Sequence, residues 1–475
     1  MSETNEPNDL KEGLKIIAEL RQIIGQQAAR IKQLEQRVEE LSGKLEETVR
    51  AGKRQAGPFS KGAPKANPKK PGQKDGHVAV HRAVPTKIDE TLKAPLPKQC
   101  GCGGAIVEDE VQQQYQVDIP RPIPTKVTQF DVSIGHCATC GKRHQGRHAE
   151  QTSNALGAAG VQIGPNVMAW GSELKHGFGI SYGKIARLLS SACGLTVNRS
   201  TLVRGAERIA VQLRPTYEQL ILRLRNSKVV YGDETSWRIN GGKAWLWVFT
   251  NDDVAVYTID PTRAHEVVQR ILGSDFKGVL KCDCFLAYDD ADLSAIEQSK
   301  CLGHLLRRCS EVGESTTGRA VVFSRQVAKL LRAAIALKGR QDKLSPHGYL
   351  VARGRLETGL DRLLLGNYTD PENAKFAKLL RKHRHQLFGF LAIPELDATN
   401  NAAERDIRPG VIVRKTNGCN RSNVGARTHE IITSVCRTCL KQGKDFVTHV
   451  ADLLRNPDTP PLDILPPISS KPAPS

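Results

Sequence analysis

The chain has 475 residues and a formal net charge of +19, with 69 Lys and Arg against 50 Asp and Glu. Its length predicts about three folded units with linkers. It contains neither a run of roughly 20 apolar residues that could span a membrane nor a secretory leader, so we expect a soluble protein with reduced thiols.

The positive net charge favours a polyanionic partner, first of all nucleic acid. Aromatic residues are only 5%, which favours binding to a duplex backbone over stacking on single strands. The alternative is a generally basic, solvated surface.

Residues 1–50 carry a heptad pattern, whose first series is Leu10, Ile17, Ile24, Ile31, Val38 and Leu45. Leucines three places later supply the second core position. This pattern predicts a parallel coiled coil and therefore a homodimer or higher oligomer. Gly25 and Gly43 lower helix propensity, so a single amphipathic helix packed on the rest of the protein is the alternative.

Residues 51–95 begin with AGKRQAGPFSKGAPKANPKKPGQKD, a basic and proline-rich stretch. Such a composition cannot bury a core, and we expect a disordered linker.

Residues 96–150 contain two close cysteine pairs, Cys100 with Cys102 and Cys137 with Cys140. Four thiolates in two pairs are typical of a structural Zn²⁺ site. The first pair is tighter than the usual spacing, so a nearby histidine (His136, His144 or His148) as replacement ligand, or four thiols without metal, remain alternatives.

Residues 151–225 show helical periodicity. The stretch ISYGKIARLLSSACGLTVNRSTLVRGAERI predicts one helix, a turn at Gly194 and a second helix that begins near Asn198 or Ser200. This order is typical of a DNA-binding helix-turn-helix. An ordinary helix pair packed through a glycine turn is the alternative.

Residues 226–425 change to an α/β pattern. Three strand-like runs, KVVYGDET, KAWLWVFT and VAVYTID, precede a helix over 263–272 and a fourth strand, GVLKCDCF. This order is typical of a ribonuclease-H-like core. A basic helical stretch over 311–395 is predicted to be an insertion in that core. Residues 426–456 are predicted to be helical, and the proline-rich residues 457–475 to be a disordered tail.

Three acids in this region could bind metal together. Asp233 is predicted to end the first strand and Asp283 the fourth, on neighbouring strands. NNAAERDIRP is predicted to be a helix that directs Glu404 inward. Three carboxylates suffice to hold two Mg²⁺ or Mn²⁺ ions for phosphodiester chemistry. The competing acids are Glu234, Asp289, Asp290 and Asp406, of which Asp406 should point away from the face of Glu404.

Further side chains are predicted to support this site. Asn400 and Arg408 lie one turn either side of Glu404 and should share its face, where they could orient a ligand or hold a phosphate. In CLGHLLRR we expect Cys301 and His304 to have a structural role beside the site, metal binding being the alternative, with Arg307 near phosphate. Arg414 and Lys415 are also expected near DNA phosphates.

The residues resemble the insertion sequence 66 family of bacterial transposases. The resemblance rests on the coil, the paired cysteines, GISYGKIARLL, DETSW with WLWV, LGSDFKGVLKCD, CLGHLLRR, NNAAERDIRP and VRKTNGCNRSNVGA. It implies a DDE transposase with the triad Asp233, Asp283 and Glu404, binding to terminal inverted repeats and target DNA, small accessory proteins, and a cytoplasmic, nucleoid-associated location. The expected reaction frees 3′-hydroxyls at the element's ends, which then attack target DNA.

Two other functions are compatible with the same features. One is a non-catalytic, zinc-containing DNA-binding regulator, and the other is a nuclease that cuts without joining. A recombinase with a Ser or Tyr nucleophile is disfavoured, because nothing in the sequence singles out one hydroxyl with its phosphate-binding arginines.

Overall fold

The computed structural model describes residues 15, 20–31, 33–41, 83–97, 99, 101–119, 122–456 and 458–463. The chain divides into two units, Met1–His81 and Arg82–Ser475. The predictions for residues 51–82 and 464–475 lie outside the described residues. Among the helices that are described, none has both the length and the apolar character of a membrane-spanning segment.

In the first unit, residues 20–31 and 33–41 are helical. Their heptad side chains are exposed, Ile24 by 65% and Val38 by 63%. An apolar stripe on a helix normally packs against another element, so the stripe is compatible with the predicted coiled coil, which stays a prediction. Leu10, Ile17 and Leu45 lie outside the described residues.

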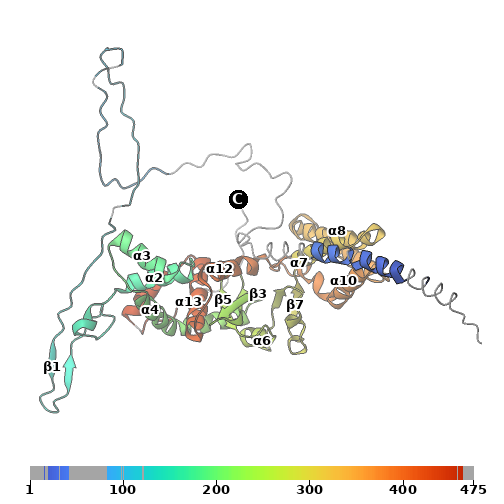
Figure 1. Cartoon of the computed structure of the whole chain (residues 1–475). Helices are drawn as coiled ribbons and strands as arrows, with labels where there is room; N and C mark the ends of the chain where they lie inside the picture. Colours follow the sequence, from blue (N-terminus) through green and yellow to red (C-terminus); the bar gives the residue numbers. More distant parts are fainter. Residues whose placement is uncertain are drawn as a thin grey trace, which may run out of the picture. The chain divides into compact units, whose positions relative to one another are not determined.

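A mixed five-stranded sheet forms the centre of the second unit (Figure 1). Its strands are β3 (Val229–Ile239), β4 (Gly242–Thr250), β5 (Ala255–Asp260), β6 (Val279–Cys282) and β7 (Glu297–Lys300), in the spatial order β5-β4-β3-β6-β7. The first three are antiparallel neighbours, whereas β6 and β7 run parallel to β3. The four predicted strands are confirmed. β7 was not predicted, because its sequence EQSK lacks apolar alternation.

Strand β3 is longer than predicted. It stays paired with β4 as far as Ile239, so Asp233 lies inside the strand and not at its end. Buried Trp237 anchors this extension. Asn240 and Gly241, with φ of 49° and 78°, make the tight turn between the strands, as the Asn-Gly pair favours.

Side chains alternate across the sheet into two separate cores. Val230, Trp247 and Leu280 belong to one core, while Tyr231 and Val248 belong to the other. The helices that build mainly the first core are α2 (Pro165–His176), α3 (Tyr182–Cys193), α4 (Arg199–Gln212), α5 (Arg214–Arg225), α6 (Glu266–Leu272), α13 (Asn423–Gln442) and α14 (Phe446–Arg455). Those of the second are α7 (Leu302–Ser315), α8 (Val321–Lys338), α9 (Pro346–Leu364), α10 (Pro371–Lys382), α11 (Arg384–Leu387) and α12 (Asn401–Asn417). Short 3-10 helices lie at Gly157–Gly160, Leu286–Asp289, Ala291–Leu293, Gly318–Ala320, Gln341–Lys343 and Gly389–Leu391.

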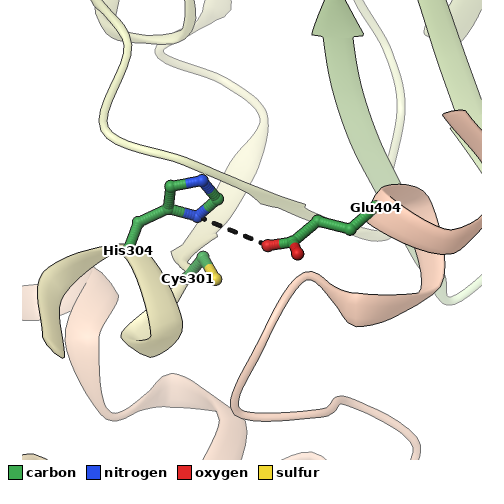
Figure 2. A group of neighbouring side chains, drawn as sticks. All are labelled: Cys301, His304 and Glu404. Carbon is green, nitrogen blue, oxygen red and sulfur yellow. Dashed lines mark ion pairs between the residues drawn. The ribbon is translucent and has the colours of Figure 1, made fainter. Parts of the chain in front are cut away.

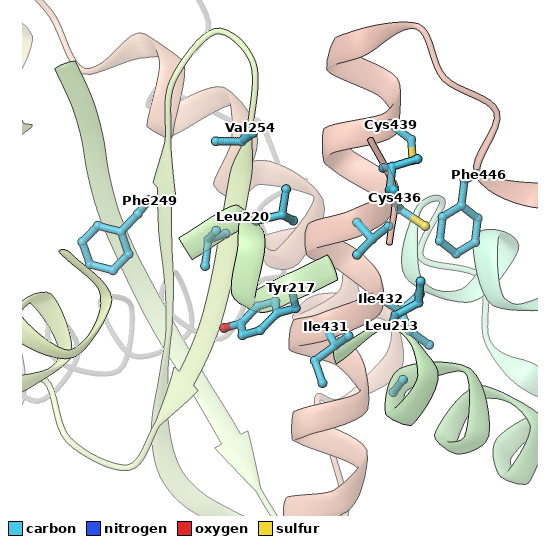
Figure 3. Close-up of a cluster of buried hydrophobic side chains, with 14 of the residues drawn as sticks. Leu213, Tyr217, Leu220, Phe249, Val254, Ile431, Ile432, Cys436, Cys439 and Phe446 are labelled. Atoms are coloured by element: carbon cyan, nitrogen blue, oxygen red, sulfur yellow. The ribbon is translucent and has the colours of Figure 1, made fainter. Parts of the chain in front are cut away.

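The first core is built around α13 (Figure 3). Ile431 and Ile432 pack with Tyr217 of α5, and Cys436 and Cys439 are buried beside them. Burial raises the pKa of Cys439 to about 12. These two buried cysteines are therefore packed, protonated thiols.

Helix α13 also covers the free edge of β5. Three backbone N–H groups of the strand donate to helix side chains: Ala255 to Thr438, Tyr257 to Ser434 and Ile259 to Glu430. The accepting side chains are spaced four residues apart and so lie on one face of the helix, while the donating N–H groups are spaced two residues apart and so lie along one edge of the strand. An uncovered edge invites pairing with other chains, and α13 removes that hazard here.

The helical predictions hold in outline but differ at their boundaries. The helices after the sheet begin at Leu302, and the C-terminal helix is divided into α13 and α14 by Gly443, which has a φ of 64°. In the predicted helix-turn-helix, α3 ends at Gly194 with a φ of 65° and α4 begins after Asn198. The two-helix arrangement is present, and its contact with DNA stays a prediction.

Candidate active site

Asp233 and Asp283 belong to neighbouring parallel strands. The register joins Val229 to Val279, Val230 to Leu280 and Tyr231 to Lys281. Continued by two residues, it sets Asp233 beside Asp283. Asp233 lies two residues after Tyr231, so both side chains are on the same face of the sheet. This is the face that α7 and α12 cover. The sheet therefore brings the two predicted aspartates together.

The surroundings of Asp233 disfavour its ionised form. Burial raises its pKa to about 7, and the carboxylates of Glu234 and Asp283 add to the increase. The Glu234 N–H, which donates to Asp233 Oδ1 at 2.9 Å, acts in the opposite direction. Asp283 Oδ1 accepts a hydrogen bond from the Phe285 N–H at 2.9 Å. A crowded, buried pair of carboxylates is stabilised in its ionised form by a nearby cation.

Glu404 lies near the start of α12, which packs on β3 and β4. Its Oε1 is 3.8 Å from Nδ1 of His304 on α7 (Figure 2). Cys301, the N-cap residue of α7, completes a group whose potential ligand atoms all lie within 4.8 Å of one another. The Glu404 side chain is 28% exposed, so it borders both this group and solvent.

The predicted triad is more widely spread than this group. Among the described residues, the sets of three potential ligands within 4.8 Å are Cys301–His304–Glu404 and His265–Asp290–Asp292, so Asp233, Asp283 and Glu404 do not form such a set. His304 nevertheless interacts electrostatically with each of the three carboxylates. The imidazole is thus the group that connects the two aspartates with Glu404.

Cys301 and His304 influence one another's ionisation. The close approach of Cys301 raises the pKa of His304 to about 9, and the carboxylates of Asp283 and Glu404 act in the same direction. Burial raises the pKa of the Cys301 thiol, but the His304 imidazole outweighs burial, so this pKa lies below its usual value. Sequence reasoning placed the two residues beside the site but did not link them to Glu404, because that contact joins helices about a hundred residues apart.

Asn400 connects the helix of Glu404 to the central sheet. It is the N-cap residue of α12, fully buried, and its Nδ2 donates to the Gly232 carbonyl at 2.7 Å. Its backbone N–H donates to Cys301 Sγ at 3.1 Å. Asn400 therefore joins α12 and α7 to the strand of Asp233. Its predicted contact with a ligand or a phosphate stays a prediction.

Glu234, one of the competing acids, already has its charge compensated by an ion pair with Arg263. Its side chain is 1% exposed, lies 2.6 Å from Arg263 Nη2, and accepts a hydrogen bond from the Tyr288 hydroxyl at 2.8 Å. The Arg263 guanidinium in turn stacks on the ring of Phe285. Through these contacts Glu234 ties β3 to Arg263 and Tyr288, on the face of the sheet opposite to Asp233.

Comparison with protein families gives a match to the model described as Transposase IS66 family over residues 160–428. This range is more than half of the chain and contains the whole sheet and all three predicted acids. This chain belongs to the IS66 family of transposases. The resemblance drawn from the sequence motifs is therefore confirmed.

Two curated relatives of this IS66-family chain are uncharacterized proteins of Sinorhizobium fredii (strain NBRC 101917 / NGR234). Protein y4qI is 24% identical over 282 residues, which are 53% of this chain and 52% of the relative. Protein y4jD is 25% identical over 289 residues, which are 55% of this chain and 56% of the relative. The chain spans about half the length of the curated relatives that it matches.

The basic residues predicted near phosphate differ in whether they already have a partner in this IS66-family chain. Arg307, Arg408 and Lys415 are exposed, and none of them pairs with an acid in the part of the chain that the structure describes. Arg414, in contrast, is tied to β3 through the hydroxyl of Thr235 and the backbone carbonyl of Ser236, both at 2.9 Å. The first three remain available for an anion.

Asp406 and Asp289, two further competing acids, are buried in ion pairs. Asp406 lies 2.7 Å from Arg437 and 2.9 Å from Lys441. Asp289 lies 3.0 Å from Lys300 and 2.8 Å from Lys382. Both acids have their charge compensated by the protein. Asp290 belongs to the more exposed group with His265.

The predicted zinc ligands are only partly described. Cys137 and Cys140 occupy the turn between the short antiparallel strands β1 (Ile134–His136) and β2 (Arg143–Gln145). The Cys137 N–H donates to the Lys142 carbonyl at 2.9 Å. Cys102 is exposed, whereas Cys100 lies outside the described residues. The turn is typical of half of a zinc site, and the complete site stays a prediction.

Proposed function

We propose that this chain is a DDE-type transposase, in which Asp233, Asp283 and Glu404 form the catalytic site on a ribonuclease-H-like core with a helical insertion. The observation that supports the proposal is the β3–β6 register, which brings Asp233 next to Asp283 when it is continued two residues beyond Tyr231 and Lys281. Helix α12, which carries Glu404, packs on β3 and β4. The family match adds the chemistry, since transposases move DNA by phosphodiester cleavage and joining.

The residues suit two divalent ions of the hard, oxygen-preferring class. The burial and crowding that raise the pKa of Asp233 leave negative charge that Mg²⁺ or Mn²⁺ would compensate. Asp233 and Asp283 would hold one ion, and Asp233 or Asp283 with Glu404 the second. When bound, such ions activate the attacking oxygen and stabilise the leaving oxygen.

The remaining side chains of the site position these acids and the DNA. Asn400 fixes the start of α12 on the strand of Asp233, which keeps Glu404 on the correct face. Arg307, Arg408 and Lys415 would hold phosphates of a duplex along this edge, because charged and exposed donors bind phosphate without reading sequence. The chain's net charge of +19 extends this attraction over the surface.

We assign the other regions to binding and assembly. The α3–α4 pair and the cysteine module, with its structural Zn²⁺, would bind the element's terminal inverted repeats, and the N-terminal helix would join two or more chains. Small accessory proteins encoded beside the element are further expected partners. These roles rest on the sequence motifs and on the family.

Substitution of the three acids tests the proposal. Asp233→Asn, Asp283→Asn and Glu404→Gln should each reduce Mg²⁺-dependent cleavage of DNA carrying the element's own ends to below detection, because each loses a metal-binding oxygen. Binding to those ends, measured by gel shift, should be nearly unchanged. Asp342→Asn, at an exposed acid on the helical insertion, is the matched control and should cleave normally.

A second assay separates transposition from cutting alone. Pre-cut ends should be joined to a target plasmid by the wild type and not by the three variants. Cleavage without joining would favour the nuclease, and end binding without either reaction would favour the regulator. Normal cleavage by any one of the three variants would remove that acid from the catalytic site.

A further inference from the structure

We propose that Cys301, His304 and Glu404 form a binding site for a soft divalent transition-metal ion such as Zn²⁺, which shares Glu404 with the proposed oxygen-ligated Mg²⁺ pair. Cys301 and His304 lie three residues apart at the start of α7, and Glu404 approaches from α12 (Figure 2). Cys301 is the N-cap residue, and its sulfur lies within 4.8 Å of a ring nitrogen of His304 in the first turn of the helix. The tertiary fold brings the third ligand to them.

The distances fit a shared ion better than a hydrogen bond. His304 Nδ1 and Glu404 Oε1 are 3.8 Å apart, which is too long for a hydrogen bond. Nitrogen and oxygen ligands of one tetrahedral Zn²⁺ ion lie roughly 3.4 Å apart, given metal–ligand bonds of about 2.1 Å. Because all three ligand atoms already lie within 4.8 Å of one another, only small side-chain movements would close the site.

Two polar groups support a ligand at this position. His304 Nδ1 is buried and makes no hydrogen bond of regular geometry among the described residues, whereas buried nitrogens normally make one. The Cys301 side chain approaches the imidazole closely. The Asn400 backbone N–H donates to Cys301 Sγ at 3.1 Å and so fixes the sulfur in place. Outer donors of this kind orient the ligands of metal sites.

The donor atoms select the class of metal. A thiolate and an imidazole favour Zn²⁺ or Co²⁺, whereas Mg²⁺ requires oxygen ligands. Three protein ligands leave one position of a tetrahedral ion open. A water molecule or a phosphate oxygen could fill that position, because Glu404 is partly exposed to solvent.

Because Glu404 would belong to both the Zn²⁺ site and the Mg²⁺ pair, Zn²⁺ binding should regulate cleavage; this consequence rests on the proposed function. A Zn²⁺ ion on Cys301, His304 and Glu404 would withdraw the Glu404 carboxylate from the Mg²⁺ pair. Micromolar Zn²⁺ should therefore inhibit Mg²⁺-dependent cleavage, and a chelator that prefers Zn²⁺ should restore it. Metal binding itself does not depend on the reaction.

Cobalt binding to the full-length protein tests the site directly. Tetrahedral Co²⁺ with a thiolate ligand gives a sulfur-to-cobalt charge-transfer band. Wild type should bind one more Co²⁺ per chain than Cys301→Ala, and the difference spectrum should contain that band. The control is Cys309→Ala, which removes another buried thiol of the same helix and should bind Co²⁺ like the wild type. Any Co²⁺ in the N-terminal cysteine module contributes equally to all three proteins.

A second variant covers the case in which Cys301→Ala fails to fold, as judged by its thermal melt. His304→Gln keeps the thiol and should lower Co²⁺ affinity at this site at least about tenfold. Equal Co²⁺ stoichiometry and affinity in the wild type and a folded variant would overturn the proposal. If Co²⁺ binds as expected but the protein cleaves DNA under no condition, the proposed function fails and the metal site stands. If the protein cleaves DNA equally well when the site is filled with Zn²⁺, the proposal that the Zn²⁺ site and the Mg²⁺ pair share Glu404 is wrong.

Discussion

Glu404 and Asp406 stand two positions apart on α12 and have opposite environments. Two residues of a helix span about 200°, so their side chains leave from opposite sides. Glu404 reaches the edge of the candidate site, whereas Asp406 is buried between Arg437, Lys441 and the Thr250 hydroxyl, which donates to it at 2.7 Å. Burial raises the pKa of Asp406, but the two cations outweigh burial and hold it below its usual value. Asp406 is therefore structural.

Loss of the Asp406 carboxylate should destabilise the protein strongly. Asp406→Ala leaves Arg437 and Lys441 without their counter-charge in a buried position, which costs about 3 kcal/mol or more. Urea unfolding followed by circular dichroism should show this decrease in the free energy of unfolding. Glu404→Gln, at a half-buried position of the same helix, should change the free energy of unfolding by less than about 1 kcal/mol. Equal stability of the two variants would contradict the structural role of Asp406.

At the level of elements, the placement of β6 decides whether Asp283 meets Asp233. Gly278 precedes the strand, and a Cβ atom there would collide with the Ser227 carbonyl oxygen and lie 2.8 Å from that of Lys228. The next residue, Val279, donates its N–H to the same Lys228 carbonyl at 2.8 Å. Only glycine allows β6 to begin so close to the chain before β3.

Gly278→Ala should therefore displace the start of β6. We expect a loss of stability of about 2 kcal/mol or more, as for other substitutions that strain a packed backbone, together with reduced cleavage. Gly354→Ala is the matched control, because Gly354 lies inside α9 with no atom near its Cβ position. Alanine there should be neutral or stabilising by up to about 1 kcal/mol. A tolerated Gly278→Ala would show that β6 has room to shift.

The contact between α2 and α13 contains two buried histidines. His176 Nδ1 and His429 Nδ1 are 2.9 Å apart, His429 stacks on Trp237, and the Tyr182 hydroxyl lies 3.3 Å from His176. Burial lowers the pKa of His429 to about 3, and Lys175 adds to the decrease. Burial also holds the pKa of His176 well below its usual value, with His429 and Lys175 acting in the same direction. Both rings are neutral in the folded protein.

This pair predicts acid sensitivity. Between the unfolded pKa of about 6.5 and the folded values, the unfolded chain binds more protons, so folding stability falls as the pH falls. Each histidine contributes a slope of up to about 1.4 kcal/mol per pH unit. Urea unfolding at pH 7 and pH 5 measures it, and His429→Gln should reduce the difference between the two pH values. An unchanged pH dependence in that variant would show that His429 does not titrate on unfolding.

At the scale of the whole molecule, the sheet separates two cores that are covered by different sets of helices. Helices α2 to α6 together with α13 and α14 cover one core, and helices α7 to α12 cover the other. The candidate site lies where the second set meets the sheet, and the helical insertion packs on α7 through α8 and α10. The N-terminal helix belongs to the separate unit Met1–His81.

Assembly should depend on that helix. Ile24→Lys with Ile31→Lys places charges in the exposed apolar stripe and should reduce the mass in light scattering from an oligomer to a single chain of 52.1 kDa. Gln26→Lys with Gln33→Lys, at outer heptad positions, should leave the mass unchanged. Deletion of residues 1–81 should also give a monomer, with the melting temperature of the second unit preserved. A monomeric wild type would exclude the coiled coil.

The sequence by itself determined the elements with strong local signals. Apolar alternation predicted β3 to β6, helical spacing predicted α12, and the motifs around Asp233 and Glu404 predicted the IS66 family. The Asn240–Gly241 pair was a local signal for the long β3–β4 hairpin that the strand prediction did not use. These features are readable because they depend on residues close together in the chain.

Tertiary structure alone decided the features that join distant residues. β7 forms because it pairs beside β6, and Asn400 is buried because α12 docks on β3. Glu404 meets Cys301 and His304 because α7 and α12 pack into the same core. None of these contacts leaves a periodic trace in the sequence. A residue's local pattern fixes the direction of its side chain along its own element, but only packing fixes what that side chain meets.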